Sequence, residues 1–238
     1  MARIALLPSP LLGSEVWRPV AVALEDLGRP AFAVEVEGAA PRSAAEALEQ
    51  FLDALPEDEE LVVVPHSNAC LYVPAIAERR SVTAAVFVDG RLPPPEGGSV
   101  TNTAAENLPM LAAKADADGV LPIWTQWWDP VEMAAHFPSP EVRAAVERQQ
   151  RRLPLAYFED AVPVPSGWAR EPCAYLAFGE NYRADTEQAR GLGWPVQVMD
   201  GEHLEMLTQP QAVAKAIAGL VSPWYHGAHG DDTAADGR

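Results

Sequence analysis

Cysteine and positive charge are both scarce in this chain. Its 238 residues include only Cys70 and Cys173, and 17 basic residues stand against 34 acidic ones, for a formal net charge of −17. Two isolated cysteines supply neither a disulfide framework nor the spacing of a metal site, so we expect no bound metal and a reducing cytoplasm. Phosphate binding needs concentrated Lys and Arg, and no basic cluster occurs. We therefore expect neither nucleic acid nor an anionic membrane as a partner.

Long apolar runs are also missing. The apolar run near the N-terminus, Ile4 to Leu7, is too short for the core of a signal peptide and far too short to span a membrane. Hydrophobic residues make up 48% of the chain and charged residues 21%, a composition typical of soluble globular proteins. The length suits one α/β domain with a normal core.

Apolar runs and helix-compatible segments alternate along the chain. We expect strands near 3–8, 31–37, 61–66, 83–89, 173–179 and 195–200, and helices near 15–27, 43–54, 69–80, 182–191 and 209–221. Two pairs fit a capping box at a helix start, Ser43 with Glu46 and Thr208 with Gln211. This alternation predicts right-handed crossovers and an α/β fold with a doubly wound, mostly parallel sheet of about six strands.

Residues 91–168 interrupt the alternation. They begin with a proline-rich stretch and later bring Trp124, Trp127 and Trp128 close together. An insertion after the carboxyl end of a strand lies over the binding edge of the sheet, which favours a helical cap or lid; extra helices packed elsewhere are the alternative. The core would then comprise 1–90 and 169–225. The tail, 226–238, is rich in His, Gly, Asp and Ala and is expected to be disordered.

The strongest chemical signal lies between Leu61 and Cys70. Four apolar residues predict a buried parallel strand, and Ser67 stands between that strand and a helix-compatible run. A sharp strand-to-helix turn at Ser67 would expose its hydroxyl at the carboxyl end of the sheet, beside the backbone N–H of Asn68. This is the nucleophile-elbow arrangement, and it points to acyl-transfer chemistry.

A serine nucleophile needs a base, and placement favours one of the five histidines. His226 and His229 lie in the tail, and His136 lies in the insertion. The side chain of His66 should diverge from that of its neighbour at a sharp turn. His203 follows the last predicted strand, where a loop can reach the serine, so we predict that His203 is the base.

The acid that orients the base has two candidates. Asp89 ends the predicted strand next to the elbow, and Glu180 ends the strand that follows along the chain. Either carboxylate could reach His203; Asp89 is favoured, and both stay open. Asp185 falls inside a predicted helix and is a weaker candidate.

An oxyanion also needs hydrogen-bond donors. One is the N–H of Asn68, and the second should come from the loop after the first strand. Pro10 in that loop has no N–H, so Ser9 or Leu11 is the candidate donor.

Together these segments resemble the α/β-hydrolase superfamily, over most of the chain from Ile4 to Val221. The resemblance is carried by Leu6-Leu7-Pro8-Ser9-Pro10 with Trp17, by Pro65-His66-Ser67-Asn68-Ala69, by Val86-Phe87-Val88-Asp89 and by Gly201-Glu202-His203. It implies a small esterase or methylesterase-like member without the family's first two strands. It also implies a serine nucleophile at Ser67, a base at His203 and no cofactor. Some subfamilies place the acid after the strand that follows the elbow, which supports Asp89.

The chain departs from the family pattern at two places. Pro8-Ser9 replaces the His-Gly before the oxyanion loop, and Pro65 and Ala69 replace the two glycines of the elbow. A small residue at position 69 still lets the helix pack closely on the strand.

Three functions fit these features. The first is hydrolysis of a small or medium apolar ester or thioester. The second is a biosynthetic reaction in the same pocket, such as cyclisation, elimination or acyl transfer without net hydrolysis. The third is a non-enzymatic ligand-binding module, which the Ser–His pair disfavours. In each case the partner is a small molecule. Trp124 and Trp128 are the expected walls of an apolar pocket, although the aromatic side chains could instead form the insertion's own core.

Overall fold

Six parallel strands form the centre of the molecule. The computed structural model describes residues 2–225, and the strand order in its main sheet is β2-β1-β3-β4-β7-β8. The bounds are β1 Arg3–Leu7, β2 Ala31–Ala33, β3 Leu61–Pro65, β4 Val82–Val88, β7 Cys173–Phe178 and β8 Val196–Met199. The predicted fold class, a doubly wound α/β fold with a mainly parallel sheet of six strands, is confirmed.

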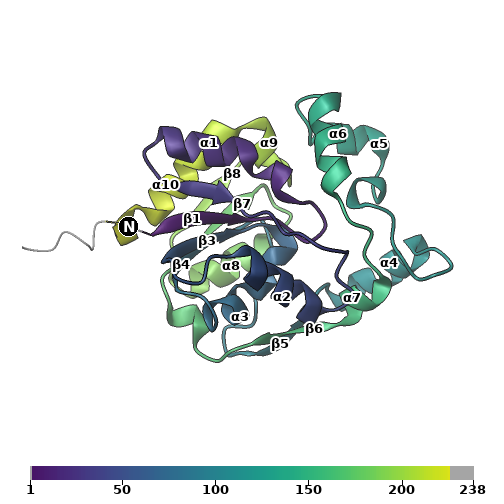
Figure 1. Cartoon of the computed structure of the whole chain (residues 1–238), viewed down its shortest axis with the longest axis horizontal. Helices are drawn as coiled ribbons and strands as arrows, with labels where there is room; N and C mark the ends of the chain where they lie inside the picture. Colours follow the sequence, from purple (N-terminus) through teal and green to yellow (C-terminus); the bar gives the residue numbers. More distant parts are fainter. Residues whose placement is uncertain (1, 226–238) are drawn as a thin grey trace, which may run out of the picture.

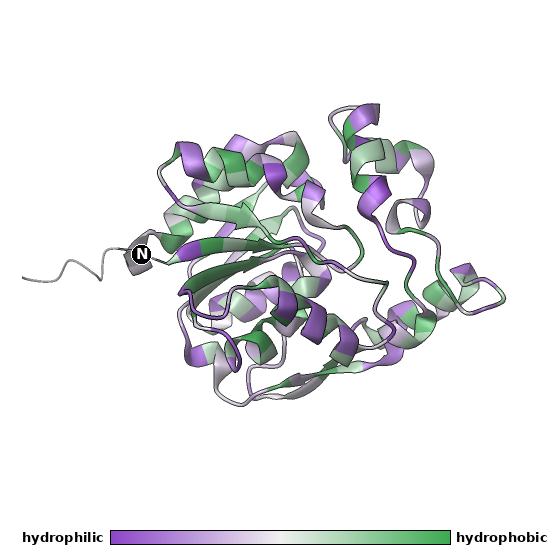
Figure 2. Ribbon diagram, viewed as in Figure 1, coloured by the Kyte–Doolittle hydropathy of each residue, from purple (hydrophilic) through white to green (hydrophobic). Residues whose placement is uncertain are grey.

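Helices cover both faces of the sheet (Figure 1). On one face lie α1 (Arg18–Asp26), the short α9 (Glu205–Thr208) and α10 (Pro210–Tyr225); on the other lie α2 (Ala44–Ala54), α3 (Val73–Ala77) and α8 (Arg183–Gly191). Strands covered on both faces read as continuous apolar runs, and every residue of β3 and β7 is buried. Figure 2 shows the same contrast between apolar strands and helices that turn polar residues outward.

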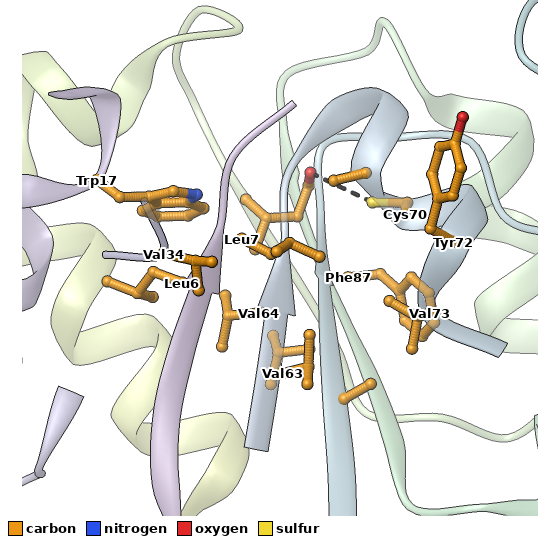
Figure 3. Packing of buried hydrophobic residues seen from close by; sticks show 14 of the residues in the cluster. Leu6, Leu7, Trp17, Val34, Val63, Val64, Cys70, Tyr72, Val73 and Phe87 are labelled. Atoms are coloured by element: carbon orange, nitrogen blue, oxygen red, sulfur yellow. Dashed lines mark hydrogen bonds between the residues drawn. The ribbon is translucent and has the colours of Figure 1, made fainter. Parts of the chain in front are cut away.

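The core next to the site is packed by aliphatic side chains of the central strands. Leu6 and Leu7 of β1 lie beside Val63 and Val64 of β3, with Trp17 at one side (Figure 3). Burying each such aliphatic side chain contributes about 1.5–3 kcal/mol. The thiol of Cys70 lies within this core, 3.6 Å from the carbonyl oxygen of Pro65 and 3.9 Å from that of Val88.

Two predicted elements are shorter or more broken than expected. The helix predicted over 69–80 consists of a 3-10 turn, Ser67–Tyr72, followed by α3. Pro74 has no N–H to donate to the preceding turn, so a continuous α-helix cannot run through it undisturbed. The strand predicted over 31–37 is limited to β2, an edge strand whose three residues pair only with β1.

The two predicted capping boxes have different outcomes. Ser43 is the N-cap of α2, and its hydroxyl accepts from the N–H of Glu46 at 3.1 Å, as predicted. Thr208 is not a cap. It ends α9 and its hydroxyl donates to the carbonyl of Glu205, because α10 begins only at Pro210, which is favoured at the start of a helix.

The 91–168 insertion has two parts. Its strands β5 (Gly98–Thr101) and β6 (Ala161–Val164) form an antiparallel pair that packs along α2 and α3. Its helices α4 (Leu108–Lys114), α5 (Pro130–Ala134), α6 (Pro140–Gln149) and α7 (Leu155–Glu159) extend beyond the sheet on one side (Figure 1). Side chains bind the insertion to the core: the Gln149 amide oxygen accepts from the N–H of Glu15 at 2.9 Å, and Asp160 accepts from the N–H of Ala44 at 2.8 Å.

The described part of the chain contains no helix with both the length and the apolar character needed to cross a bilayer. The tail at 226–238, with His226 and His229, lies outside the described residues.

Candidate active site

Ser67 occupies the turn between β3 and the helical segment that follows it. Its φ is +58°, a left-handed conformation that is uncommon for a residue with a side chain. Such strain is held only where the surroundings enforce it, and here Gly90 is part of those surroundings. A Cβ on Gly90 would lie 2.4 Å from the Ser67 carbonyl oxygen, so only glycine lets the end of β4 approach the turn this closely.

A chain of hydrogen bonds joins Ser67 to His203 and Asp89. The Oγ of Ser67 lies 3.0 Å from Nε2 of His203, and Nδ1 of His203 lies 2.6 Å from Oδ2 of Asp89. The second oxygen of Asp89 accepts from the backbone N–H of Phe178 at 2.9 Å. Asp89 is fully buried at the end of β4, and His203 is 9% exposed in the loop after β8.

This geometry sets the protonation pattern of the site. The Asp89 carboxylate can only accept, so Nδ1 of His203 carries the proton and Nε2 is left as an acceptor for the Ser67 hydroxyl proton. The arrangement can therefore activate a serine nucleophile and return its proton to a leaving group.

Glu180 does not contact His203. Its side chain is exposed, and its backbone carbonyl accepts from the N–H of Arg183. The chain turns at Gly179, with φ +68°, immediately after β7. Of the two predicted carboxylates, the structure places Asp89 and not Glu180 against His203. Asp185 is engaged elsewhere, accepting from the N–H of Leu92 at 2.7 Å, and burial raises its pKa.

His66 packs against His203 and bonds its backbone. Its ring is buried, its centroid lies 4.5 Å from that of His203, and its Nε2 donates to the His203 carbonyl at 2.9 Å. Burial and the nearby His203 hold the pKa of His66 well below its usual range. A neutral His66 therefore fixes the backbone of the His203 loop. His136 lies in the wall of the cleft next to the site, with Nε2 3.8 Å from the carboxylate of Glu202.

The three predicted oxyanion donors, Asn68, Leu11 and Ser9, differ in whether their N–H groups are free to reach an oxyanion at Ser67. Asn68 follows the elbow at the start of a helical segment, where backbone N–H groups have no intrahelical acceptor. Leu11 lines the cavity, but its N–H points to Oγ of Ser9 at 3.4 Å. The carbonyl of Ser9 accepts from the N–H groups of Leu12 and Gly13. Ser9 therefore organises the loop and does not line the cavity over Ser67.

The side chain of Asn68 joins a buried polar network. Its amide donates to the Asn102 carbonyl at 2.6 Å, and its oxygen accepts from the Tyr157 hydroxyl at 2.5 Å. Tyr72 donates to the side-chain oxygen of Asn102 at 2.8 Å. Two of these residues belong to the insertion, so the network holds the insertion against the elbow.

A cavity of about 220 Å³ opens above Ser67 and His203. Its walls are mostly apolar and aromatic, and they come from the core loops and the insertion: Leu11, Leu71, Met110, Leu111, Trp124, Trp127, Trp128 and Phe158. A wider cleft of about 890 Å³ adjoins it and shares Arg91, Trp124 and Trp128 with it. The two tryptophans predicted as walls differ: Trp124 is 8% exposed with its ring 5.7 Å from that of His203, whereas Trp128 is 44% exposed.

Tyr182 also lies at the site, although the sequence pattern gives no signal for it. It precedes α8 and lines both the cavity and the adjoining cleft. Its ring centroid lies 5.7 Å from that of His203. Its hydroxyl lies close to the side chain of Ser67. No motif surrounds Tyr182; only its position shortly after a predicted strand could have drawn attention to it.

His66, Asp89 and His203 also offer potential metal ligands within 4.8 Å of one another. The Asp89 and His203 atoms of that set already bond each other, so an ion would have to break the link that orients the base. The donor set fits a hydrogen-bonded triad better than a metal centre.

A parallel sheet with a strained serine after a central strand, and with a histidine and a buried aspartate at the same edge, defines the α/β-hydrolase fold. Comparison with solved structures agrees. An extracellular α/β-hydrolase from a Paenibacillus species, described as sharing structural and functional homology with tobacco salicylic acid binding protein 2, is similar with a TM-score of 0.71 and 16% identity, over 92% of this chain and 99% of that one.

Two further structures show the same likeness. Polyneuridine aldehyde esterase has a TM-score of 0.67 and 19% identity, covering 92% of this chain and 98% of its own. Tomato methylketone synthase I, in complex with 2-tridecanone, has a TM-score of 0.63 and 17% identity, covering 94% and 98%. No protein-family model and no curated protein sequence matches the chain. At these identities the likeness establishes the α/β-hydrolase fold.

Proposed function

We propose that this protein is a serine hydrolase that cleaves a small to medium apolar ester or thioester through an acyl-enzyme. The observation that carries the proposal is the continuous hydrogen-bonded chain from Ser67 through His203 to Asp89. The similar solved structures include an esterase and an extracellular hydrolase, which supports the same class of reaction.

The steps of acylation and deacylation follow from the positions of Ser67, His203 and Asp89. Ser67 attacks the carbonyl carbon while Nε2 of His203 takes its proton, and Asp89 stabilises the imidazolium that forms. Collapse of the tetrahedral intermediate breaks the bond to the leaving group, which takes the proton back from His203. Water then attacks the acyl-enzyme with His203 again as the base, and the acid is released.

The walls of the cavity support an apolar substrate. Aromatic and aliphatic side chains dominate around Ser67, and flat rings bury much area with few rotamers to freeze. We propose that the helical part of the 91–168 insertion acts as a lid, because its tryptophans lie over the serine and would exclude water from the reacting atoms.

A second candidate is a biosynthetic reaction without net hydrolysis in the same cavity. One observation favours it: in the loop after β1, Pro10 has no N–H and the N–H groups of Leu11, Leu12 and Gly13 all point to Ser9. A site with few backbone oxyanion donors is less suited to the tetrahedral intermediate of hydrolysis or acyl transfer, so this observation favours cyclisation or elimination.

The test is labelling with a fluorophosphonate probe, followed by a panel of p-nitrophenyl esters and acyl thioesters. The hydrolase proposal requires that the wild type is labelled and turns over at least one ester. Ser67→Ala and His203→Ala should each lose most of the turnover with nearly unchanged thermal stability. Labelling without turnover would favour the biosynthetic candidate, and wild-type turnover by Ser67→Ala would refute the nucleophile.

A further inference from the structure

An oxyanion formed at Ser67 has few backbone donors within reach. The N–H of Asn68 is one, at the start of the helical segment after the elbow. The loop after β1 offers little: Ser9 does not line the cavity, Pro10 lacks an N–H, and the next three N–H groups are turned to Ser9. Single oxyanion donors are each worth about 10²–10³ in kcat in serine hydrolases, so a functional site needs a second donor from elsewhere.

Tyr182 lines the cavity over Ser67 and carries a hydroxyl that can donate. Its side chain lines the cavity together with Ser67, Asn68 and His203, and its ring lies at 30° to the ring of His203 with 5.7 Å between centroids. Its hydroxyl lies close to the side chain of Ser67, on the cavity that a substrate carbonyl must enter. The phenol comes from the loop between β7 and α8, so it is held independently of the loop after β1.

The phenol of Tyr182 stays protonated near neutral pH. Burial is the main reason that its pKa is raised, and the negative charges of Asp89 and Asp185 add to the effect. A neutral phenol is a hydrogen-bond donor, and a donor in a site with little water is worth more than one in bulk solvent.

We propose that Tyr182 is a catalytic residue whose hydroxyl donates to the substrate oxyanion that forms when Ser67 attacks. This inference rests on the proposed function. In the attack, the Ser67 proton moves to Nε2 of His203, a bond forms between Oγ and the carbonyl carbon, and the carbonyl π electrons move onto oxygen. That oxygen accepts hydrogen bonds from Tyr182 and from the N–H of Asn68. The phenol keeps its proton throughout, and the oxyanion collapses as the leaving group departs with the proton from His203.

The experiment compares wild type with Tyr182→Phe, Tyr182→Leu and Ser67→Ala. It measures the rate of fluorophosphonate labelling, kcat and KM on the best p-nitrophenyl ester, and thermal stability. Tyr182→Phe keeps the ring against His203 and removes only the hydroxyl. We expect it to lower the labelling rate and kcat by on the order of 10²-fold, with KM within about threefold and unchanged melting temperature. Tyr182→Leu should lose little more in kcat, because the hydroxyl and not the ring acts on the oxyanion.

The outcomes separate the two proposals. If Ser67→Ala is inactive while Tyr182→Phe keeps kcat within threefold of wild type, the role of Tyr182 is refuted and the hydrolase proposal stands. A raised KM with unchanged kcat in Tyr182→Phe would also refute it, because the hydroxyl would then bind substrate and transition state equally. If wild type is neither labelled nor active on any ester, the proposed function falls, and the inference falls with it.

Discussion

At the residue scale, the site is built from two strained positions. Ser67 and Asp89 are the only residues other than glycine with positive φ among residues 2–225, and each directly follows a neighbouring parallel strand or its last bridge. Each such conformation costs about 1–3 kcal/mol and persists only where packing enforces it. The strain aims the hydroxyl and the carboxylate at opposite nitrogens of His203.

The role of Asp89 is tested by comparing two isosteric substitutions. Asp89→Asn keeps the shape but replaces an acceptor with an amide, which favours the wrong tautomer of His203. We expect a loss on the order of 10³–10⁴-fold in kcat. Glu180→Gln is the control, because the exposed Glu180 does not contact the base, and its kcat should stay near that of wild type. Steady-state kinetics on one ester decide the ranking, and equal losses would contradict the assignment of Asp89.

His66 makes stability depend on pH in a defined direction. Burial lowers its pKa in the folded protein below the ordinary value of 6.5, so below that pH the unfolded chain binds a proton that the native residue refuses. The free energy of unfolding should therefore fall as the pH drops below about 6.5, by up to about 1.4 kcal/mol per pH unit from this group. Urea unfolding of wild type and His66→Gln between pH 7 and 5 measures the effect. An equally steep fall in His66→Gln would show that other groups cause it.

At the element scale, the start of α2 joins the core to the insertion. Ser43 accepts from the N–H of Glu46, and Asp160, which follows α7, accepts from the N–H of Ala44. Two of the N–H groups that a helix leaves unpaired at its N-terminus are therefore satisfied, one locally and one by a residue 116 positions away.

Removing either cap should destabilise the protein. We expect Ser43→Ala to lower the free energy of unfolding by about 1 kcal/mol, while Ser43→Asn, which keeps a capping oxygen, should lose much less. Asp160→Ala should cost a similar amount and also weaken the docking of the insertion. Chemical denaturation measures both. A Ser43→Asn variant as unstable as Ser43→Ala would contradict the capping explanation.

At the scale of the whole molecule, the insertion and the sheet edge together make the cavity, and its two tryptophans should behave differently. Trp128 is 44% exposed and packs edge-on against Trp124, which is 8% exposed within the core cluster. Trp128→Ala should leave the melting temperature nearly unchanged and alter KM or the preferred acyl length by about 3–10-fold. Trp124→Ala should lower stability by about 3–5 kcal/mol, because it empties a buried site.

Calorimetry and a series of p-nitrophenyl esters of increasing chain length measure the two effects. Trp128→Phe is the matched control, since it keeps an aromatic wall and should retain most of the wild-type preference. An unchanged ester preference in Trp128→Ala would show that this side chain does not touch the substrate.

The local pattern of residues was sufficient for much of the architecture. The apolar runs at 61–66 and 173–179 predict β3 and β7 within one residue, because strands covered on both faces must be apolar throughout. The turn at Ser67 follows from a buried strand that meets a helix-compatible run. Placement after the last strand was enough to select His203 from five histidines.

Only the tertiary structure determined the direction in which each side chain at the sheet edge points. Asp89 and Glu180 both follow a central strand, and only the turns after β4 and β7 send one carboxylate to His203 and the other to solvent. Tyr182 comes to lie beside the cavity over Ser67, a residue far from it in the chain, only through the folding of the whole domain. Short-range order follows from apolar periodicity and backbone sterics, which are local properties of the sequence. The direction of a side chain at the edge of the sheet depends on the strand register and on the turns of several segments. Register and turns are set only when the chain folds.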